Sequence, residues 1–403
     1  MTVNMDHDVA CYDRCNCKRD LSDGNVLYAA MRRAMRGSDW KPQMQRFETN
    51  YLFELAKMQK DLKEQSYEFQ PAIEFTLHER GKERAISGEH IRDRIVKHAL
   101  CDAVLMPAIR KQLIYDNGAS IQGKGIDFTR RRMVTHLRKF YEEHGNNGYI
   151  LLMDYSKFYD NIRHAKLLEI LEKHIQDESA KWLLEKILEN AKVDVSYMSD
   201  KEYESCMDAV FDSLKYRQID KSLMTGTKYM RKHMNIGDQV AQIAGISYPM
   251  EIDNYAKIVR GFKYYARYMD DSYAIHESRE VLEELRNEIT EIARRIGITV
   301  NERKTRICKL SDRWRFLQIQ YRLTESGKIL QRINPKRITV MRRKMKKLTG
   351  KMSAREFQNW FMAWYESRKK YMSGIQRKRI LELYRDLRRQ CNVHGAAIGR
   401  NKT

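Results

Sequence analysis

Long apolar runs are missing from this sequence. No stretch of its 403 residues approaches the ~20 consecutive apolar residues that a membrane-spanning helix requires. The chain starts with the polar and acidic segment MTVNMDHDVA, whereas a secretory leader begins with basic residues and continues with an apolar segment. We therefore expect no membrane partner and no secretory signal.

A pattern of paired cysteines is also lacking. The seven cysteines are an odd number scattered over the chain, which indicates reduced thiols and a cytoplasmic location. Cys11, Cys15 and Cys17 lie near His7, so a zinc site is conceivable. Their C-x3-C-x-C spacing has no second ligand pair downstream, which argues against zinc.

Acidic residues are scarce relative to basic ones. The chain has 54 Asp and Glu against 76 Lys and Arg, a net charge of +22 with an isoelectric point near 9.6. From Gln331 to Thr403 there are 21 basic and 4 acidic residues, a net of +17 in 73 residues. This uneven distribution favours nucleic acid as a partner over a merely basic, soluble surface.

Two adjacent carboxylates stand out within the aromatic segment KYYARYMDDSYAI, from Lys263 to Ile275. The flanks predict two short strands with Asp270 and Asp271 at the turn between them. Neighbouring carboxylates repel one another, and burial raises their pKa values unless a cation compensates. The alternative for such a pair is a solvated hairpin tip.

A second acidic strand end lies upstream, in YILLMDYSKFYD. A run of apolar and aromatic residues from Tyr149 leads to Asp154, and polar residues follow at once. Asp154, Asp270 and Asp271 together would supply the oxygen ligands that two Mg²⁺ ions need for phosphoryl transfer. Mn²⁺ is a possible substitute. Asp271 need not bind as directly as the other two.

These two stretches resemble motifs of the reverse transcriptases. YMDD is the family's acidic hairpin, and Asp154 with Phe158, Tyr159 and Asp160 matches its D-x-x-x-F-[FY]-D strand, with about 115 residues between the two motifs. The resemblance implies an α+β right-hand polymerase with fingers, a palm of antiparallel sheet backed by helices, and a helical thumb. It also implies an RNA-directed DNA polymerase that uses dNTPs.

Further segments follow the family's order. By resemblance, Lys82 and Arg84 in the turn of residues 69–100 would contact the nucleotide triphosphate, and the Gly-rich segment 115–133 would support the template. An exposed basic hairpin is the alternative for Lys82 and Arg84. Tyr159 would pack under the sugar and exclude a 2′-hydroxyl, which disfavours an RNA polymerase of the same architecture.

The segment MNIGDQVAQIAGISYPMEIDNYAK resembles the family motif Q-G-x-x-x-S-P, which lies against the nascent base pair. Ile236 replaces the Gln before Gly237, and Ala241 with Gln242 replaces Ser-Pro. Enzymes of diversity-generating retroelements depart in a similar way and copy template adenines with low fidelity. Loss of a polar contact to the nucleotide fits looser selection. A phage-defence or group II intron-like enzyme is the alternative.

Two later segments complete the resemblance. Lys304 in GITVNERKTRI would touch the triphosphate or donate a proton to pyrophosphate, with a surface lysine as the alternative. WRFLQIQYRL resembles the primer-grip hairpin, with Trp314, Phe316 and Leu317, and Gln318 stands where Gly is usual.

The expected organisation has four parts. Residues 1–68 form an N-terminal helical extension, with two helices over 21–65, and residues 69–148 form the fingers. The palm spans 149–325 with a helical insertion near 190–230, and the basic thumb spans 326–403. Expected partners are a structured template RNA, an RNA/cDNA duplex and dNTPs, and a small basic accessory protein is a further candidate. A non-catalytic RNA-binding scaffold is a remaining alternative.

Overall fold

The computed structural model describes residues 20–79 and 82–398, and the side chains of 20–78 and 83–391. The hypothetical zinc ligands His7, Cys11, Cys15 and Cys17 lie outside the described residues. Within them, no helix combines the length and the apolar character needed to cross a membrane.

Residues 20–68 contain three helices, where we expected two over residues 21–65. They are α2 (Gly24–Met35), α3 (Pro42–Thr49) and α4 (Tyr51–Lys63). Pro42 occupies the first turn of α3, where its missing N–H costs nothing, so it starts a helix and does not separate two longer ones. α2 packs on α5 (Ile91–Leu100), which continues as η1 (Cys101–Leu105) and α6 (Met106–Arg110).

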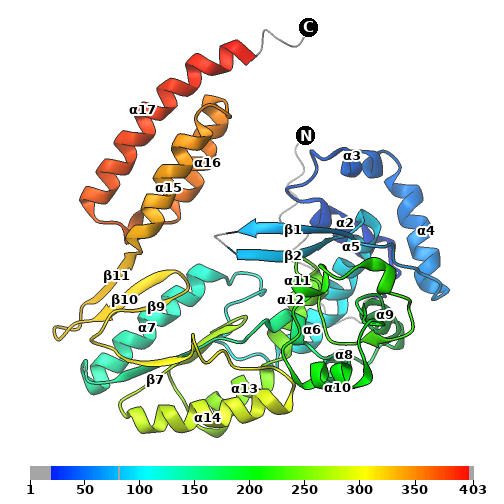
Figure 1. Cartoon of the computed structure of the whole chain (residues 1–403), viewed down its shortest axis with the longest axis horizontal. Coiled ribbons are helices and arrows are strands. Elements are labelled where there is room, and N and C mark those ends of the chain that lie inside the picture. The colour runs from blue at the N-terminus through cyan, green and yellow to red at the C-terminus, as the bar shows by residue number, and fades with distance from the viewer. Residues whose placement is uncertain (1–19, 80–81, 399–403) are drawn as a thin grey trace.

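An antiparallel hairpin precedes α5. Its strands are β1 (Ile73–Glu79) and β2 (Lys82–Gly88). In Figure 1 the hairpin projects from the α2–α5 region toward the side of the molecule where the C-terminal helices stand. Phe75 and Leu77 on β1 are 48% and 44% exposed, so burial of apolar surface contributes little to holding β1 in place.

The centre of the molecule is an antiparallel sheet of four strands in the order β6-β7-β3-β8. One face packs against α14 (Arg279–Arg295) and α12 (Gln239–Ser247), and the other packs against α7 (Ile126–His144). Alternation along β3 sends Leu151 and Met153 to the first face, and Ile150 and Leu152 to the second. The strands are β3 (Tyr149–Met153), β6 (Tyr265–Tyr268), β7 (Asp271–His276) and β8 (Arg306–Lys309).

Between β3 and β6 the chain is mainly helical. The helices are η2 (Phe158–Asn161), α8 (His164–Glu172), α9 (Glu178–Asn190), α12 (Gln239–Ser247), α13 (Met250–Asn254) and η4 (Tyr255–Val259).

Residues 193–230 form a small module, called the 193–230 module below. Its ends meet in a two-strand ladder, β4 (Val193–Asp194) with β5 (Tyr229–Met230). Val193, Val195, Phe211 and Met230 form a hydrophobic cluster of its own. The module also contains α10 (Asp200–Asp208), α11 (Ser213–Tyr216) and η3 (Lys221–Leu223).

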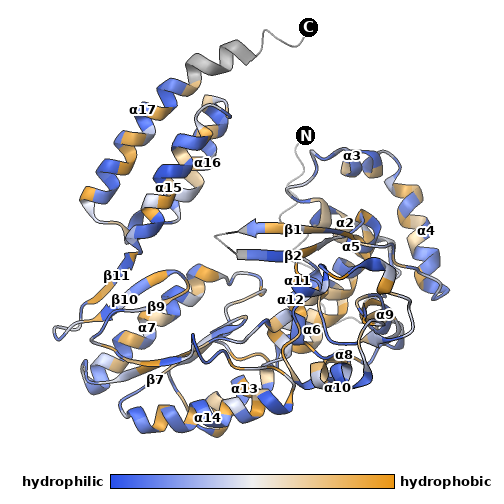
Figure 2. Cartoon of the chain, in the orientation of Figure 1, coloured by the Kyte–Doolittle hydropathy of each residue, from blue (hydrophilic) through white to orange (hydrophobic). Residues whose placement is uncertain are grey.

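The C-terminal part begins with a three-stranded sheet and ends in helices that stand apart from the rest (Figure 1). Phe361 and Tyr384 stack in the core of these helices with ring centroids 4.2 Å apart. Figure 2 shows hydrophilic residues alternating with apolar ones along α15 and α17, as expected for helices with one buried face. The elements are β9 (Trp314–Phe316), β10 (Ile319–Leu323), β11 (Ile329–Ile333), α15 (Pro335–Leu348), α16 (Ala354–Glu366), η5 (Lys369–Tyr371) and α17 (Gly374–Ile398).

Candidate active site

Asp154 lies directly after β3, at the end of the central sheet. Its neighbour Met153 pairs with Ser272 on β7, so Asp154 emerges beside the turn that precedes β7. The residue is 7% exposed. Asn301 donates its backbone N–H to the Asp154 carbonyl at 2.8 Å and its side-chain amide to Oδ1 at 3.2 Å. The acidic strand end predicted from the sequence therefore exists, and its position is fixed by hydrogen bonds.

Asp270 lies in the tight turn between β6 and β7, where Met269 adopts a φ of +55°. Burial and then the nearby charge of Asp154 raise the pKa of Asp270, and the positive charges of Lys304 and Arg84 oppose that shift. Asp270 and Asp154 are thus close enough to repel one another. Asp271 opens β7 and is half-buried.

Asp154 and Asp270 bring carboxylate oxygens to the same end of the sheet, and such oxygens are the ligands that Mg²⁺ prefers. A divalent cation therefore fits this position. Among residues 20–78 and 83–391, no three His, Cys, Asp or Glu side chains are already gathered as a metal cluster. The ammonium of Lys304 lies 2.6 and 2.7 Å from the two carboxylate oxygens of Asp154 and so balances part of the negative charge there.

A buried arginine that the sequence did not reveal supports the turn between β6 and β7 that carries Asp270, called the acidic turn below. Arg267 is fully buried, and its guanidinium donates to both carboxylate oxygens of Asp253 at 2.7–2.9 Å. It also donates to the backbone carbonyls of Met269, Gly245 and Ile246 at 3.0, 3.0 and 2.8 Å. One side chain thus ties the turn before Asp270 to α12 and α13. The only sequence signal was a lone Arg in an aromatic strand.

Tyr159 is half-buried next to the acidic turn. Its hydroxyl lies 3.5 Å from the sulfur of Met269, and burial, followed by the charge of Asp270, raises its pKa to about 12. A Cβ added at Gly245 would come within 2.7 Å of the Tyr159 hydroxyl, so α12 can approach the ring closely only with glycine there. Phe158 is buried in the core.

Arg84 reaches this site from the hairpin. It lies on β2 opposite Leu77, and its positive charge opposes the rise that burial causes in the pKa values of both Asp270 and Tyr159. Lys82 begins β2, and its side chain lies outside the described residues.

Ile236 and Gly237 form the turn before α12. Gly237 adopts a φ of +109°, and Asp238 caps the helix by accepting the Val240 N–H at 2.7 Å. The Gln242 side chain accepts a hydrogen bond from the Ser120 hydroxyl at 3.1 Å. The turn is therefore connected through α12 to the Gly-rich segment 115–133.

Lys97 on α5 provides a second, buried connection to this turn. Its ammonium contacts Asp238 at 2.7 Å and also pairs with Glu89. Lys97 and Asp238 are 4% and 2% exposed. A buried charge without a partner destabilises the folded protein, so the loss of any one of these three groups should destabilise the others.

The predicted primer-grip hairpin is present as β9 and β10, but its named side chains face inward. Trp314 is fully buried and stacks on Tyr321, and Phe316 packs edge-on against Tyr273. Leu317 and Gln318 form the two-residue turn with φ of +44° and +73°. Such a turn favours glycine, which explains why Gln318 is unusual there.

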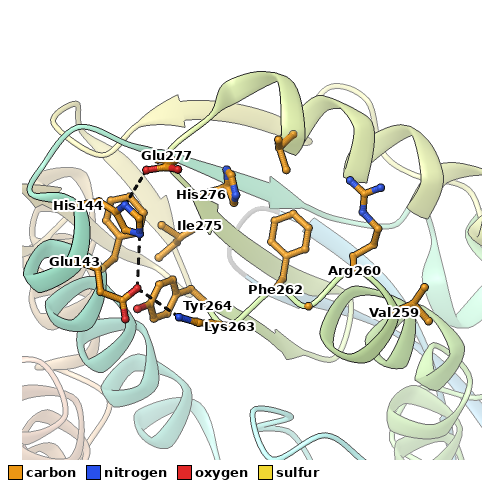
Figure 3. Close-up of a pocket in the computed structure, with 13 residues that line it drawn as sticks. Glu143, His144, Val259, Arg260, Phe262, Lys263, Tyr264, Ile275, His276 and Glu277 are labelled. Atoms are coloured by element: carbon orange, nitrogen blue, oxygen red, sulfur yellow. Dashed lines mark ion pairs between the residues drawn. The ribbon is translucent and has the colours of Figure 1, made fainter.

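A separate pocket of about 450 Å³ lies at the opposite end of β7, where His276 ends the strand and Glu277 follows it (Figure 3). His144 pairs with Glu277 at 2.7 Å, and Lys263 lies 3.7 Å from Glu143. The length of β7 separates this pocket from Asp271, so the pocket is not part of the acidic site.

Comparison with known proteins agrees with this geometry. The profile of the family described as "Reverse transcriptase (RNA-dependent DNA polymerase)" matches residues 74–347, from β1 to the last turn of α15. A comparison with curated protein sequences finds no match. The family match covers more than half of the chain, and the acidic strand end, the acidic turn and the basic hairpin all fall within it. The chain belongs to the reverse transcriptase family and is an RNA-directed DNA polymerase with the palm and fingers of that family.

Proposed function

We propose that Asp154, Asp270 and Asp271 are the catalytic carboxylates and hold two Mg²⁺ ions. The observation that carries this proposal is the convergence of Asp154 and Asp270 at the ends of adjacent strands, where their charges repel. When bound, the ions would activate the primer 3′-hydroxyl and stabilise the leaving pyrophosphate. Lys304 pairs with Asp154, and its half-exposed ammonium would be free to turn toward the phosphates of a bound nucleotide.

The remaining site residues have proposed roles around the nucleotide. Arg84 and Lys82 would bind the triphosphate from the hairpin, and Tyr159 would lie under the sugar and exclude a 2′-hydroxyl. Ile236 and Gly237 would face the nascent base pair. In the primer grip, the inward packing of Trp314 and Phe316 supports a structural role for both, so that the turn at Leu317 would meet the primer.

Domain names follow from these roles. The fingers span 69–148, the palm 149–325, and the basic thumb 326–403, with residues 1–68 as an N-terminal extension. The thumb would hold an RNA/cDNA duplex by its phosphates, because α15 is strongly basic on its exposed side.

The biological role we favour is the error-prone enzyme of a diversity-generating retroelement, acting on a structured template RNA with a small basic accessory protein. The support is Ile236 at the start of the turn and Gln242 on α12, where the usual motif has Gln and Ser-Pro. In this chain Gln242 bonds Ser120, so it is occupied within the protein and does not replace the missing nucleotide contact. A phage-defence or group II intron-like enzyme is the second candidate.

The test is primer extension on an RNA template with each dNTP alone and in mixtures, followed by sequencing. The wild type is compared with Asp270→Asn, with Ile236→Gln, and with Asp312→Asn as an exposed control. We expect Asp270→Asn to lose at least 10²-fold in activity and Asp312→Asn to lose none. Errors concentrated at template adenines and reduced by Ile236→Gln would support the retroelement role, whereas faithful synthesis would refute it.

A further inference from the structure

The 193–230 module touches two parts of the site that are far apart in the sequence. One is the loop after Asp154, and the other is the hairpin that carries Arg84. No role for this module follows from the family motifs, because they lie on either side of it.

The first attachment is to the loop that follows Asp154. Asp160 accepts the backbone N–H of Ser213 at 3.2 Å, and the side chain of Asn161 accepts the backbone N–H of Phe211 at 2.9 Å. Lys157 pairs with Asp212 at 3.1 Å. Three consecutive residues of the module are therefore fixed to the loop between Asp154 and α8.

The second attachment is made by Arg217, which directly follows α11. Its guanidinium donates to the backbone carbonyls of Phe75 on β1 at 2.8 Å and Ile86 on β2 at 3.1 Å, and to the Ser87 hydroxyl at 3.2 Å. Phe75 and Ile86 face one another in the hairpin register. One planar side chain thus holds both strands at the same level, which a lysine cannot do.

The two attachments are separated by a single helical turn. Ser213 begins α11, and Arg217 is the residue after its end, so the span along the helix is about 6 Å. Arg84 lies two residues from Ile86 toward the hairpin tip, on the same face of β2. The module therefore joins the loop beside Asp154 to the strand that carries Arg84 through a short and rigid connection.

A parallel polar path runs between the same two regions. His233 contacts Asp160 at 3.1 Å with one ring nitrogen and Asn235 at 3.1 Å with the other. The Ser87 hydroxyl also donates to Asn235 at 3.1 Å. Asn235 immediately precedes Ile236, so this path passes through the turn proposed to face the base pair.

We propose that the 193–230 module fixes the hairpin at a set position over the carboxylates, with Arg217 as the positioning residue. Because β1 is largely exposed, the hydrogen bonds from Arg217 to Phe75, Ile86 and Ser87 carry much of this task. In this proposal Arg217 acts through Arg84, which lies two residues from Ile86 on β2 and whose positive charge opposes the rise that burial causes in the pKa values of Asp270 and Tyr159. The kinetic consequence of the proposal rests on the proposed function of Arg84 in binding the nucleotide triphosphate.

Two measurements on Arg217→Met and Arg217→Lys test the proposal. Amide hydrogen exchange reports on the stability of the hairpin directly and does not depend on enzymatic activity. We expect amides of residues 73–88 to exchange at least tenfold faster in Arg217→Met, with amides of β3 and β7 unchanged. Exchange in Arg217→Lys should be intermediate, because lysine keeps the positive charge but not the planar guanidinium that donates to both strands. Lys215→Met, an exposed change on α11, is the matched control and should resemble the wild type.

Steady-state primer extension is the second measurement. We expect the KM for dNTP to rise about tenfold in Arg217→Met, with a smaller change in kcat and an unchanged affinity for the primer–template duplex. Hairpin exchange equal to the wild type, or faster exchange with no change in KM, would overturn the proposal. If the wild-type protein adds no dNTP, the proposed function fails, and hydrogen exchange alone then decides whether Arg217 holds the hairpin.

Discussion

Removing the guanidinium of Arg267 should destabilise the protein more than most single substitutions. Arg267→Met leaves the Asp253 carboxylate, which is 1% exposed, with the Tyr265 hydroxyl at 2.8 Å in place of a bidentate cation. Loss of one partner from a buried ion pair costs about 3–5 kcal/mol. Three backbone carbonyls also lose their donor, at roughly 1–3 kcal/mol for each that stays unpaired. We therefore expect a loss of at least about 3 kcal/mol.

The assay is urea unfolding of the wild type, Arg267→Met, Asp253→Asn and the double variant. If the two groups act as a pair, the double variant should lose less than the sum of the singles by at least about 1.5 kcal/mol. Arg279→Met, which breaks the exposed pair with Glu283, is the control and should cost under about 1 kcal/mol. Additive single effects, or a cost for Arg267→Met near that of the control, would refute this account of the acidic turn.

Three other predictions address separate features. Burial lowers the pKa of His164 to about 4 from 6.5. Between pH 4 and 6.5 the unfolded chain therefore binds more protons than the folded protein, and acidification over this range should remove up to about 3 kcal/mol of stability. The free energy of unfolding of His164→Gln, measured with urea, should lack this contribution. Equal pH dependence of the unfolding free energy in the wild type and His164→Gln would contradict the prediction. Gly245→Ala should displace Tyr159 and raise ribonucleotide incorporation relative to dNTPs, while an unchanged ratio would count against Tyr159 as the selector. Lys97→Met should cost about 3–5 kcal/mol in urea unfolding because it leaves the buried carboxylate of Asp238 and the half-buried carboxylate of Glu89 without their cation, and a loss under about 1 kcal/mol would argue against a paired network.

The sequence predicted the elements whose signals are local. The run of apolar residues before Asp154 and the aromatic flanks of Asp270 identify buried strands by composition alone, and the structure pairs these strands as neighbours. The hairpin around Leu317, in contrast, was expected only from the family resemblance. The family resemblance supplied the order of the motifs, which composition could not.

What the sequence did not reveal depends on partners that are distant in the chain. Arg267 looked like one more basic residue, because its partner Asp253 belongs to another element, α13. The contact of Lys304 with Asp154 joins residues 150 positions apart. Nothing in the sequence pointed to Arg217 either, since its role depends on where the hairpin lies in the folded chain. A single residue type carries no information about which remote group it will meet when the chain folds.

The order of strands in the central sheet has a consequence for synthesis of the chain. β3 lies between β7 and β8, yet Tyr149 pairs with Lys309 about 160 residues later. At about 5–20 residues per second on the ribosome, the β3 segment waits roughly 10–30 s for its second partner. Its apolar run is a hazard for aggregation during that interval. We therefore expect the yield of native enzyme to depend on translation speed and chaperones through the stretch between β3 and β8.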